Sequence, residues 1–167
     1  MTSLGPYVEI SDIKYKYTFS NVKKDIIIDK TSISGILSNG MYNKFLYIVK
    51  KANMLDNLNH NMSEYTLFAP TDENIKDISI KFIDDNFDLL LCRKIVLGSL
   101  LNKKLHSRYL LFCKSGFYKT KYDSKLFINL KNNNFEINNK IKILKLDITA
   151  SNGIIHNIDN IIYPYII

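Results

Sequence analysis

The spacing of apolar residues predicts helices in the first half of the chain. Thr31 or Ser32 is placed to cap a short helix that runs through Leu37, and Asn39-Gly40 ends it. A second helix follows, because apolar residues then recur at intervals of three and four positions and form one stripe. The stripe consists of Tyr42, Phe45, Leu46, Val49 and Ala52. Both helices are expected to face a common core.

The second half of the chain predicts strands. A Leu-rich helix is first expected over residues 87–101, with Asp84-Asp85 at its start. Residues 125–130 and 135–138 then flank an Asn-rich turn, which is typical of a hairpin. Residues 141–148 alternate between apolar and polar. Helices followed by strands indicate the α+β class, as a β-sandwich of about seven short strands carrying a cap of short helices.

Two stretches stand out within this pattern. In the first, residues 65–68 form a short apolar strand that meets Pro70, and Thr71-Asp72 then supplies capping groups for a helix start. In the second, Asn152-Gly153 predicts a turn, because both residues tolerate positive φ. A β-branched run follows and predicts a buried strand that stops near Pro164.

His156 lies within that last strand. Side chains alternate along a strand, so His156 shares a face with Ile154 and Ile158. This is a core position, and we expect a buried histidine bonded to the backbone or to the Thr71-Asp72 segment. A catalytic or ligand role is the alternative.

The two stretches together resemble the paired signature segments of the fasciclin (FAS1) domain family. Thr66-Leu-Phe-Ala-Pro-Thr-Asp-Glu73 matches the first segment, and Ala150-Ser-Asn-Gly-Ile-Ile-His-Asn-Ile-Asp159 matches the second. The resemblance covers residues 31–167 and leaves residues 1–30 as an N-terminal arm. It implies that eight residues define the fold: Phe68, Pro70, Thr71, Asp72, Asn152, Gly153, His156 and Asp159.

The resemblance also implies a function, namely a non-enzymatic protein–protein interaction or cell-adhesion module. Asp147-Ile148 is the candidate partner-binding site, because some FAS1 adhesion domains carry Asp-Ile just before the second segment. A carboxylate there could serve a receptor's metal ion. The other interpretation is an ordinary strand pair, with Ile148 in the core and Asp147 in solvent. Many FAS1 domains carry a Tyr-His pair where this chain has Gly98-Ser99, and His106 is out of register with it.

Length and composition fit one globular domain of 167 residues, with 46% hydrophobic and 23% charged residues. We expect no membrane span, and charged residues interrupt residues 1–30, so no secretory signal is visible. The family resemblance nevertheless implies an extracellular or surface location. The alternative is a virion or intracellular location, with the protein as a structural component of a capsid or surface layer whose arm tethers neighbours or drives self-association.

The net charge of +7 keeps a protein soluble, and it also fits an acidic partner. A basic binder of nucleic acid or acidic glycan is therefore a second alternative function. Lysines interleave with aromatics in residues 13–19 and 117–122, which suits stacking and phosphate contact but equally an amphipathic strand with tyrosines on one side. Tyrosine-rich surfaces at the arm and at residues 118–122 are candidate contact surfaces.

No residue pattern predicts catalysis, a cofactor or a metal. The chain lacks a glycine-rich phosphate loop, an HExxH motif and a nucleophile elbow, and its three histidines are irregularly spaced. Cys92 is expected to be a buried thiol, with one disulfide to Cys113 as the alternative. Asn61 begins a glycosylation sequon. The protein partner is expected to be a receptor, a matrix protein or a capsid neighbour.

Overall fold

A computed structural model describes residues 26–60 and 62–164 of the chain. The arm expected at residues 1–30 therefore lies almost wholly outside the described residues, as does the sequon asparagine Asn61. Helices are α1 Ile33–Leu37, α2 Asn43–Lys51, η1 Asp72–Ile75 (a 3₁₀-helix), α3 Ile80–Asn86, α4 Leu89–Gly98 and α5 Ser107–Cys113. Strands are β1 Tyr65–Pro70, β2 Leu100–Leu101, β3 Ser115–Lys119, β4 Lys125–Lys131, β5 Asn134–Ile137, β6 Ile141–Ala150 and β7 Gly153–Ile158.

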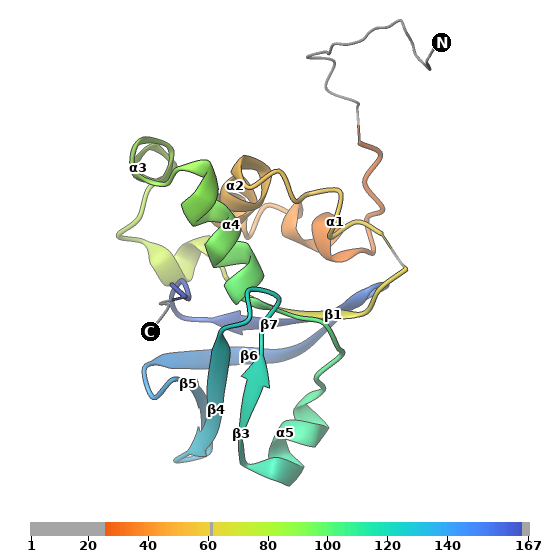
Figure 1. Cartoon of the computed structure of the whole chain (residues 1–167), viewed down its shortest axis with the longest axis vertical. Helices are drawn as coiled ribbons and strands as arrows, with labels where there is room; N and C mark the ends of the chain where they lie inside the picture. Colours follow the sequence, from red (N-terminus) through yellow and green to blue (C-terminus); the bar gives the residue numbers. More distant parts are fainter. Residues whose placement is uncertain (1–25, 61, 165–167) are drawn as a thin grey trace, which may run out of the picture.

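The seven strands form one hydrogen-bonded sheet in the order β2-β1-β7-β6-β5-β4-β3. β1 and β7 pair in parallel, and every other neighbouring pair is antiparallel. The sheet bends, so that β3 and β4 run across the direction of β1 and β7 (Figure 1). The expected α+β class, with seven short strands and several short helices, is confirmed. The two halves of the bent sheet take the place of the two layers of the expected sandwich.

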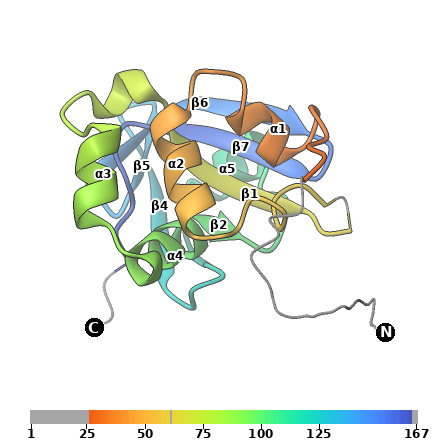
Figure 2. The same cartoon turned by 90° about the horizontal axis from the view of Figure 1, so that it is seen from above.

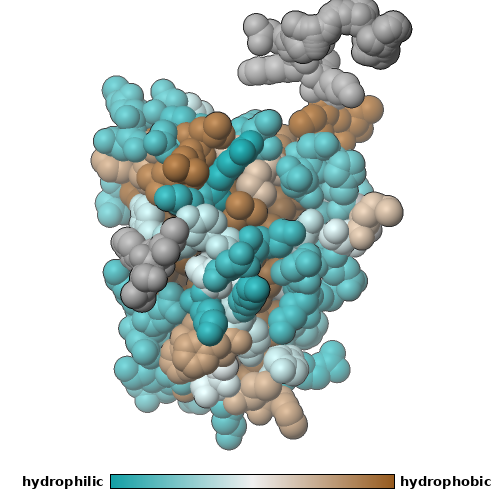
Figure 3. All heavy atoms as spheres, viewed as in Figure 1, coloured by the Kyte–Doolittle hydropathy of each residue, from teal (hydrophilic) through white to brown (hydrophobic). Residues whose placement is uncertain are grey.

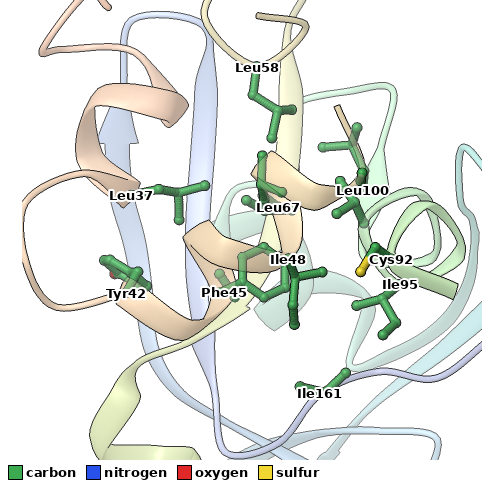
Figure 4. Packing of buried hydrophobic residues seen from close by; sticks show 14 of the residues in the cluster. Leu37, Tyr42, Phe45, Ile48, Leu58, Leu67, Cys92, Ile95, Leu100 and Ile161 are labelled. Atoms are coloured by element: carbon green, nitrogen blue, oxygen red, sulfur yellow. The ribbon is translucent and has the colours of Figure 1, made fainter. Parts of the chain in front are cut away.

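Helices α1 to α4 cover the outer side of β1 and β7, where the first hydrophobic core lies (Figures 1 and 2). Phe45 and Ile48 of α2 meet Leu67 of β1 and Ile95 of α4 in this core, as Figure 4 shows. The stripe predicted for this helix is confirmed, because its members are buried or, for Leu46, packed partly buried against the core: Tyr42, Phe45, Leu46, Val49 and Ala52. Ile48, which the prediction left out, is buried as well. Ser32 caps α1 as expected, its side chain accepting a hydrogen bond from the amide of Gly35.

A second core fills the inside of the bend. Phe68 of β1 and Ile158 of β7 face it, and alternate residues of β3 to β6 close it from the other side. Leu67 and Phe68 thus serve different cores, because neighbouring strand residues point to opposite faces. The central strands β1 and β7 are consequently buried on both sides.

Two expected helix boundaries were wrong, and one helix was not predicted. Asp84 and Asp85 do not start the Leu-rich helix but end α3, and Asp88 caps α4 by accepting the amide of Leu91. α4 stops at Gly98, which leaves Leu100–Leu101 as strand β2. α5 was not predicted, because its seven residues are too short to display a helical period.

Both cysteines are free thiols, so the expected disulfide alternative is not realised. Cys92 is buried in the first core, and burial raises the pKa of its thiol. None of the helices in residues 26–60 and 62–164 is long and apolar enough to cross a membrane.

Candidate interaction site

The two signature stretches lie side by side, because β1 and β7 are parallel neighbours. Thr66 is in register with Ile154, and Phe68 is in register with His156. The rings of Phe68 and His156 are 5.6 Å apart between centroids. Residues separated by more than 80 positions in the sequence therefore form one continuous region of the structure.

His156 is fully buried and bonded to the backbone at both ring nitrogens, as the sequence predicts. The Asp147 amide donates to Nδ1 at 3.0 Å, so the ring proton is on Nε2, which donates to the Leu105 carbonyl at 2.7 Å. Burial lowers the pKa of His156, although the bond to Leu105 and the charge of Asp147 oppose this shift. An imidazole that is neutral, inaccessible and hydrogen-bonded at both nitrogens has a structural role.

Asp147 lies at an irregularity in the β6–β7 pairing, and its backbone has the unusual φ of 62°. This bulge turns its carboxylate toward the start of α5. The Ser107 amide donates to one carboxylate oxygen at 2.9 Å, and the Ser107 hydroxyl donates to the other. Burial alone raises the pKa of Asp147, but the Ser107 bonds and the neighbouring His106 and His156 bring it below its ordinary value.

Ile148 does not share an exposed face with Asp147. It pairs with Ile155 of β7 and packs, partly buried, against the first core. The side chain of Asp147 is 26% exposed, and Nδ1 of His106 lies 3.5 Å from its carboxylate. The two predicted partner-binding residues thus present one partly accessible carboxylate rather than a joint acidic and apolar surface.

Thr66 holds the segment that leads into α5. Its hydroxyl accepts from the Leu105 amide at 2.7 Å and donates to the Lys103 carbonyl at 2.7 Å. With His156 bonded to the Leu105 carbonyl and Asp147 bonded to Ser107, the segment before α5 is fixed to three strands. Sequence reasoning missed Ser107, because nothing in the sequence around it signals a carboxylate 40 residues away.

Asn152 connects the turn before β7 to the helical layer. Its side-chain oxygen accepts from the Ile33 amide at 2.9 Å, and its amide donates to the carbonyls of Leu58 and His60 at 2.8 and 2.9 Å. Gly153 follows at the closest approach of β7 to β1, where a Cβ atom would lie 2.0 Å from the Tyr65 carbonyl oxygen. Only glycine fits there.

Asp72 caps a different helix from the one expected. Its carboxylate accepts from the amides of Asn43 and Lys44 at 3.2 and 2.8 Å, so it caps α2 rather than η1. Thr71 likewise makes no backbone cap, and its hydroxyl donates to the side chain of Asn74. Pro70 is buried at the end of β1, and Asp159 accepts from the Lys142 amide. Asp72 and Asp159 thus join separate elements to one another.

The described residues contain no group of three or more His, Cys, Asp or Glu side chains placed to hold a metal ion. The surface instead offers apolar side chains at the end of the helical layer, which we term the helical corner. Its members are Ile80, Phe82, Leu89 and Leu90, with exposed fractions of 41%, 47%, 50% and 61%. Figure 3 shows apolar atoms gathered over the α3–α4 end of the molecule.

Tyr118, expected on a contact surface, is buried against the second core and is only 6% exposed. The strand predicted there exists as β3, but its outward aromatic residue is Phe117. The prediction placed the tyrosines on the outward side of this strand, whereas Tyr118 points inward. A one-position shift in a strand exchanges its two faces, so the predicted tyrosine surface becomes a phenylalanine surface.

Comparisons with a family model and with solved structures both find the Fasciclin (FAS1) domain. The sequence model of the Fasciclin domain matches residues 40–164. The solved structure of a FAS1 domain pair from the insect cell adhesion molecule fasciclin I superposes with a TM-score of 0.63 and 22% identity. The match covers 82% of this chain and 51% of that one, so this chain spans about half the length of the domain pair. The comparison with curated protein sequences gives no match.

Proposed function

Because the chain belongs to the Fasciclin domain family, we propose that it is a non-enzymatic protein–protein interaction module of the cell-adhesion type. Family membership also supports a location outside cells or at a surface. Its partner is a second protein, either a surface receptor or a matrix component.

The observation that carries this proposal is the helical corner. Four large apolar side chains are exposed within eleven consecutive residues, and none of them is a member of either buried core. The ring of Phe82 packs edge-on against Phe87 of the first core. Exposed Asp84, Asp85 and Asp88 lie along the same segment. An apolar centre with a charged rim is the usual composition of a protein interface, in which a few aromatic or apolar anchors supply most of the binding energy.

Asp147 and Ile148 form the second part of the proposal. The Asp147 carboxylate is reachable from solvent, but the hydrogen bonds from Ser107 occupy both of its oxygens. A receptor's metal ion would have to replace these bonds to bind the carboxylate. Binding there would therefore release the start of α5, and it would require a divalent cation.

Attachment of cells to a surface coated with the purified domain tests the proposal. The double variant Phe82→Ser/Leu90→Ser is expected to lose attachment, because it removes two anchors of the helical corner. Met41→Ser is the matched control, since Met41 is 56% exposed but lies outside the corner. Asp147→Asn and a chelator separate the contribution of the metal-dependent contact.

Attachment that survives both Phe82→Ser/Leu90→Ser and Asp147→Asn would refute the assignment of these surfaces. An absence of attachment and of saturable binding to any cell type would refute the adhesion function itself. The alternative of a capsid or surface-layer component depends on residues 1–30. It is tested separately by comparing the solution mass of the full chain with that of a chain starting at Thr31.

A further inference from the structure

The positive charge of the chain is concentrated in one segment. Residues 100–145 contain eleven Lys and Arg residues but only two acidic residues, a net charge of +9, whereas the whole chain carries +7. All other residues together are thus slightly acidic. This segment builds α5 and β3 to β5 and most of β6, which is the half of the molecule away from helices α1 to α4 (Figure 1).

Within that half, one side of the bent sheet faces outward, and we term it the outer sheet face. On each strand its residues alternate with buried ones, such as Tyr118, Leu126 and Ile143, which face the second core. The outer sheet face consists of Phe117, Lys119, Lys125, Phe127, Lys131, Glu136, Lys142 and Leu144, together with the uncharged polar residues Ser115, Asn129 and Asn134. It therefore carries four lysines, one carboxylate and three large apolar side chains.

Two of these lysines lie directly opposite each other. Lys119 of β3 is in register with Lys125 of β4. Like charges in such a cross-strand pair destabilise a sheet. Asp123 relieves this only weakly, because its ion pair with Lys119 spans 3.3 Å between side chains that are more than 70% exposed. An external anion would remove the repulsion.

Apolar side chains lie next to this charge. Phe117 is paired with Phe127 across the strands, with ring centroids 4.9 Å apart and planes at 40°. Phe117 is 71% exposed and Leu144 is 52% exposed. Neither residue type has a polar tip, so water is a poor partner for them.

We propose that the outer sheet face binds the surface of an anionic lipid bilayer. Lysines near a negatively charged leaflet are attracted to its headgroups, while phenylalanine and leucine side chains enter the boundary with the acyl chains. A single-stranded nucleic acid fits less well, because it needs ring faces open for stacking. Phe127 covers one side of the Phe117 ring, which leaves a single open ring face for a base, and Leu144 cannot stack.

This inference is independent of the helical corner and of the proposed protein partner. In the fold, the two surfaces occupy different ends of the molecule, so one domain could contact a lipid surface and a protein together. Failure of the vesicle experiment below would leave the cell-attachment experiment unaffected.

Flotation of the purified full chain with vesicles tests the proposal. The protein is expected to float with phosphatidylcholine vesicles that contain phosphatidylserine, and to remain behind with vesicles of phosphatidylcholine alone. Lys119→Gln/Lys125→Gln should lower the partition coefficient about 25-fold, at about fivefold for each lysine near the surface. The variant should unfold at the same or a higher temperature, because the cross-strand repulsion is gone.

Matched controls separate a specific face from net charge. Lys50→Gln/Lys76→Gln removes the same charge from exposed positions of the helical layer and should leave the partition coefficient within about twofold of that of the unmodified chain. Phe117→Ser should lower the partition coefficient about tenfold, and should do so even at high salt, where lysine contacts are screened. Met41→Ser should have no effect.

Three results would overturn the proposal. One is an unmodified chain that does not float with the anionic vesicles at low ionic strength. A second is an equal loss of binding in Lys119→Gln/Lys125→Gln and in Lys50→Gln/Lys76→Gln. Tight binding to a single-stranded oligonucleotide or to heparin in place of the vesicles would assign the face to those polyanions and would likewise refute a lipid partner.

Discussion

Replacement of Asn152 by alanine should weaken the fold more than its position in a turn suggests. Asn152 is 1% exposed and bonds three backbone groups of the helical layer through one amide. The substitution removes all three bonds without placing a polar atom in their stead. The perturbation therefore reports on the attachment of α1 and the preceding loop to the sheet.

The size of the loss in stability depends on whether each of the three backbone groups finds another hydrogen-bond partner in the variant. The Ile33 amide belongs to the first turn of α1 and has no intrahelical partner, so it is left unpaired and buried at a cost of about 1–3 kcal/mol. The Leu58 carbonyl still accepts from the Ser34 amide at 3.1 Å, and the exposed His60 can turn to water. These two lost bonds add about 1 kcal/mol together, which gives about 2–4 kcal/mol in all.

Urea unfolding followed by circular dichroism measures this loss as a decrease in the free energy of unfolding at constant slope. Asn86→Ala is the control, because Asn86 is exposed and makes a single local bond to the Phe82 carbonyl, so it should change the free energy by less than about 0.5 kcal/mol. If Asn152→Ala lowered the free energy of unfolding by less than about 1 kcal/mol, or by no more than the control does, the reasoning would be refuted.

Two further outcomes are expected. The pKa of His156 is lowered in the fold, so the unfolded chain binds more protons than the folded chain as the pH falls below 6.5. The free energy of unfolding measured in urea should therefore decrease as the pH drops through this value. His156→Phe should flatten that part of the pH profile. Asp72→Ala should destabilise the protein by about 1 kcal/mol through loss of the α2 cap, whereas Glu73→Ala should have no such effect, and equal losses would contradict the assigned cap.

Local patterns in the sequence were sufficient to predict those structural features that depend on a single helix, strand or turn. The stripe of α2, the capping role of Ser32 and the inward side of His156 follow from spacing or side-chain chemistry alone. The hairpin of β4 and β5 also follows, since Asn132 and Asn133 both adopt the positive φ that the Asn-rich turn requires. These features need no knowledge of the rest of the fold.

Contacts between distant segments could not be predicted in this way. Asp72 has the chemistry of a cap, but only the packing of η1 beside α2 determines which helix it caps. The bulge at Asp147 depends on its pairing with β7 and on the position of Ser107. The charge segregation was readable from the sequence, and counting charges by segment rather than over the whole chain would have found it.

The position of β7 in the sheet also bears on how the protein is synthesised. β7 follows every other described strand in sequence, yet it lies between β1 and β6 and pairs with both. A nascent chain that has emerged only as far as residue 150 has β1 and β6 without their shared neighbour, and the signature histidine is missing from the second core. Such a chain exposes two unpaired apolar strand edges, which are sites of aggregation. Productive folding on the ribosome must therefore wait for residues 153–158, and chaperones that shield strand edges should matter most in that interval.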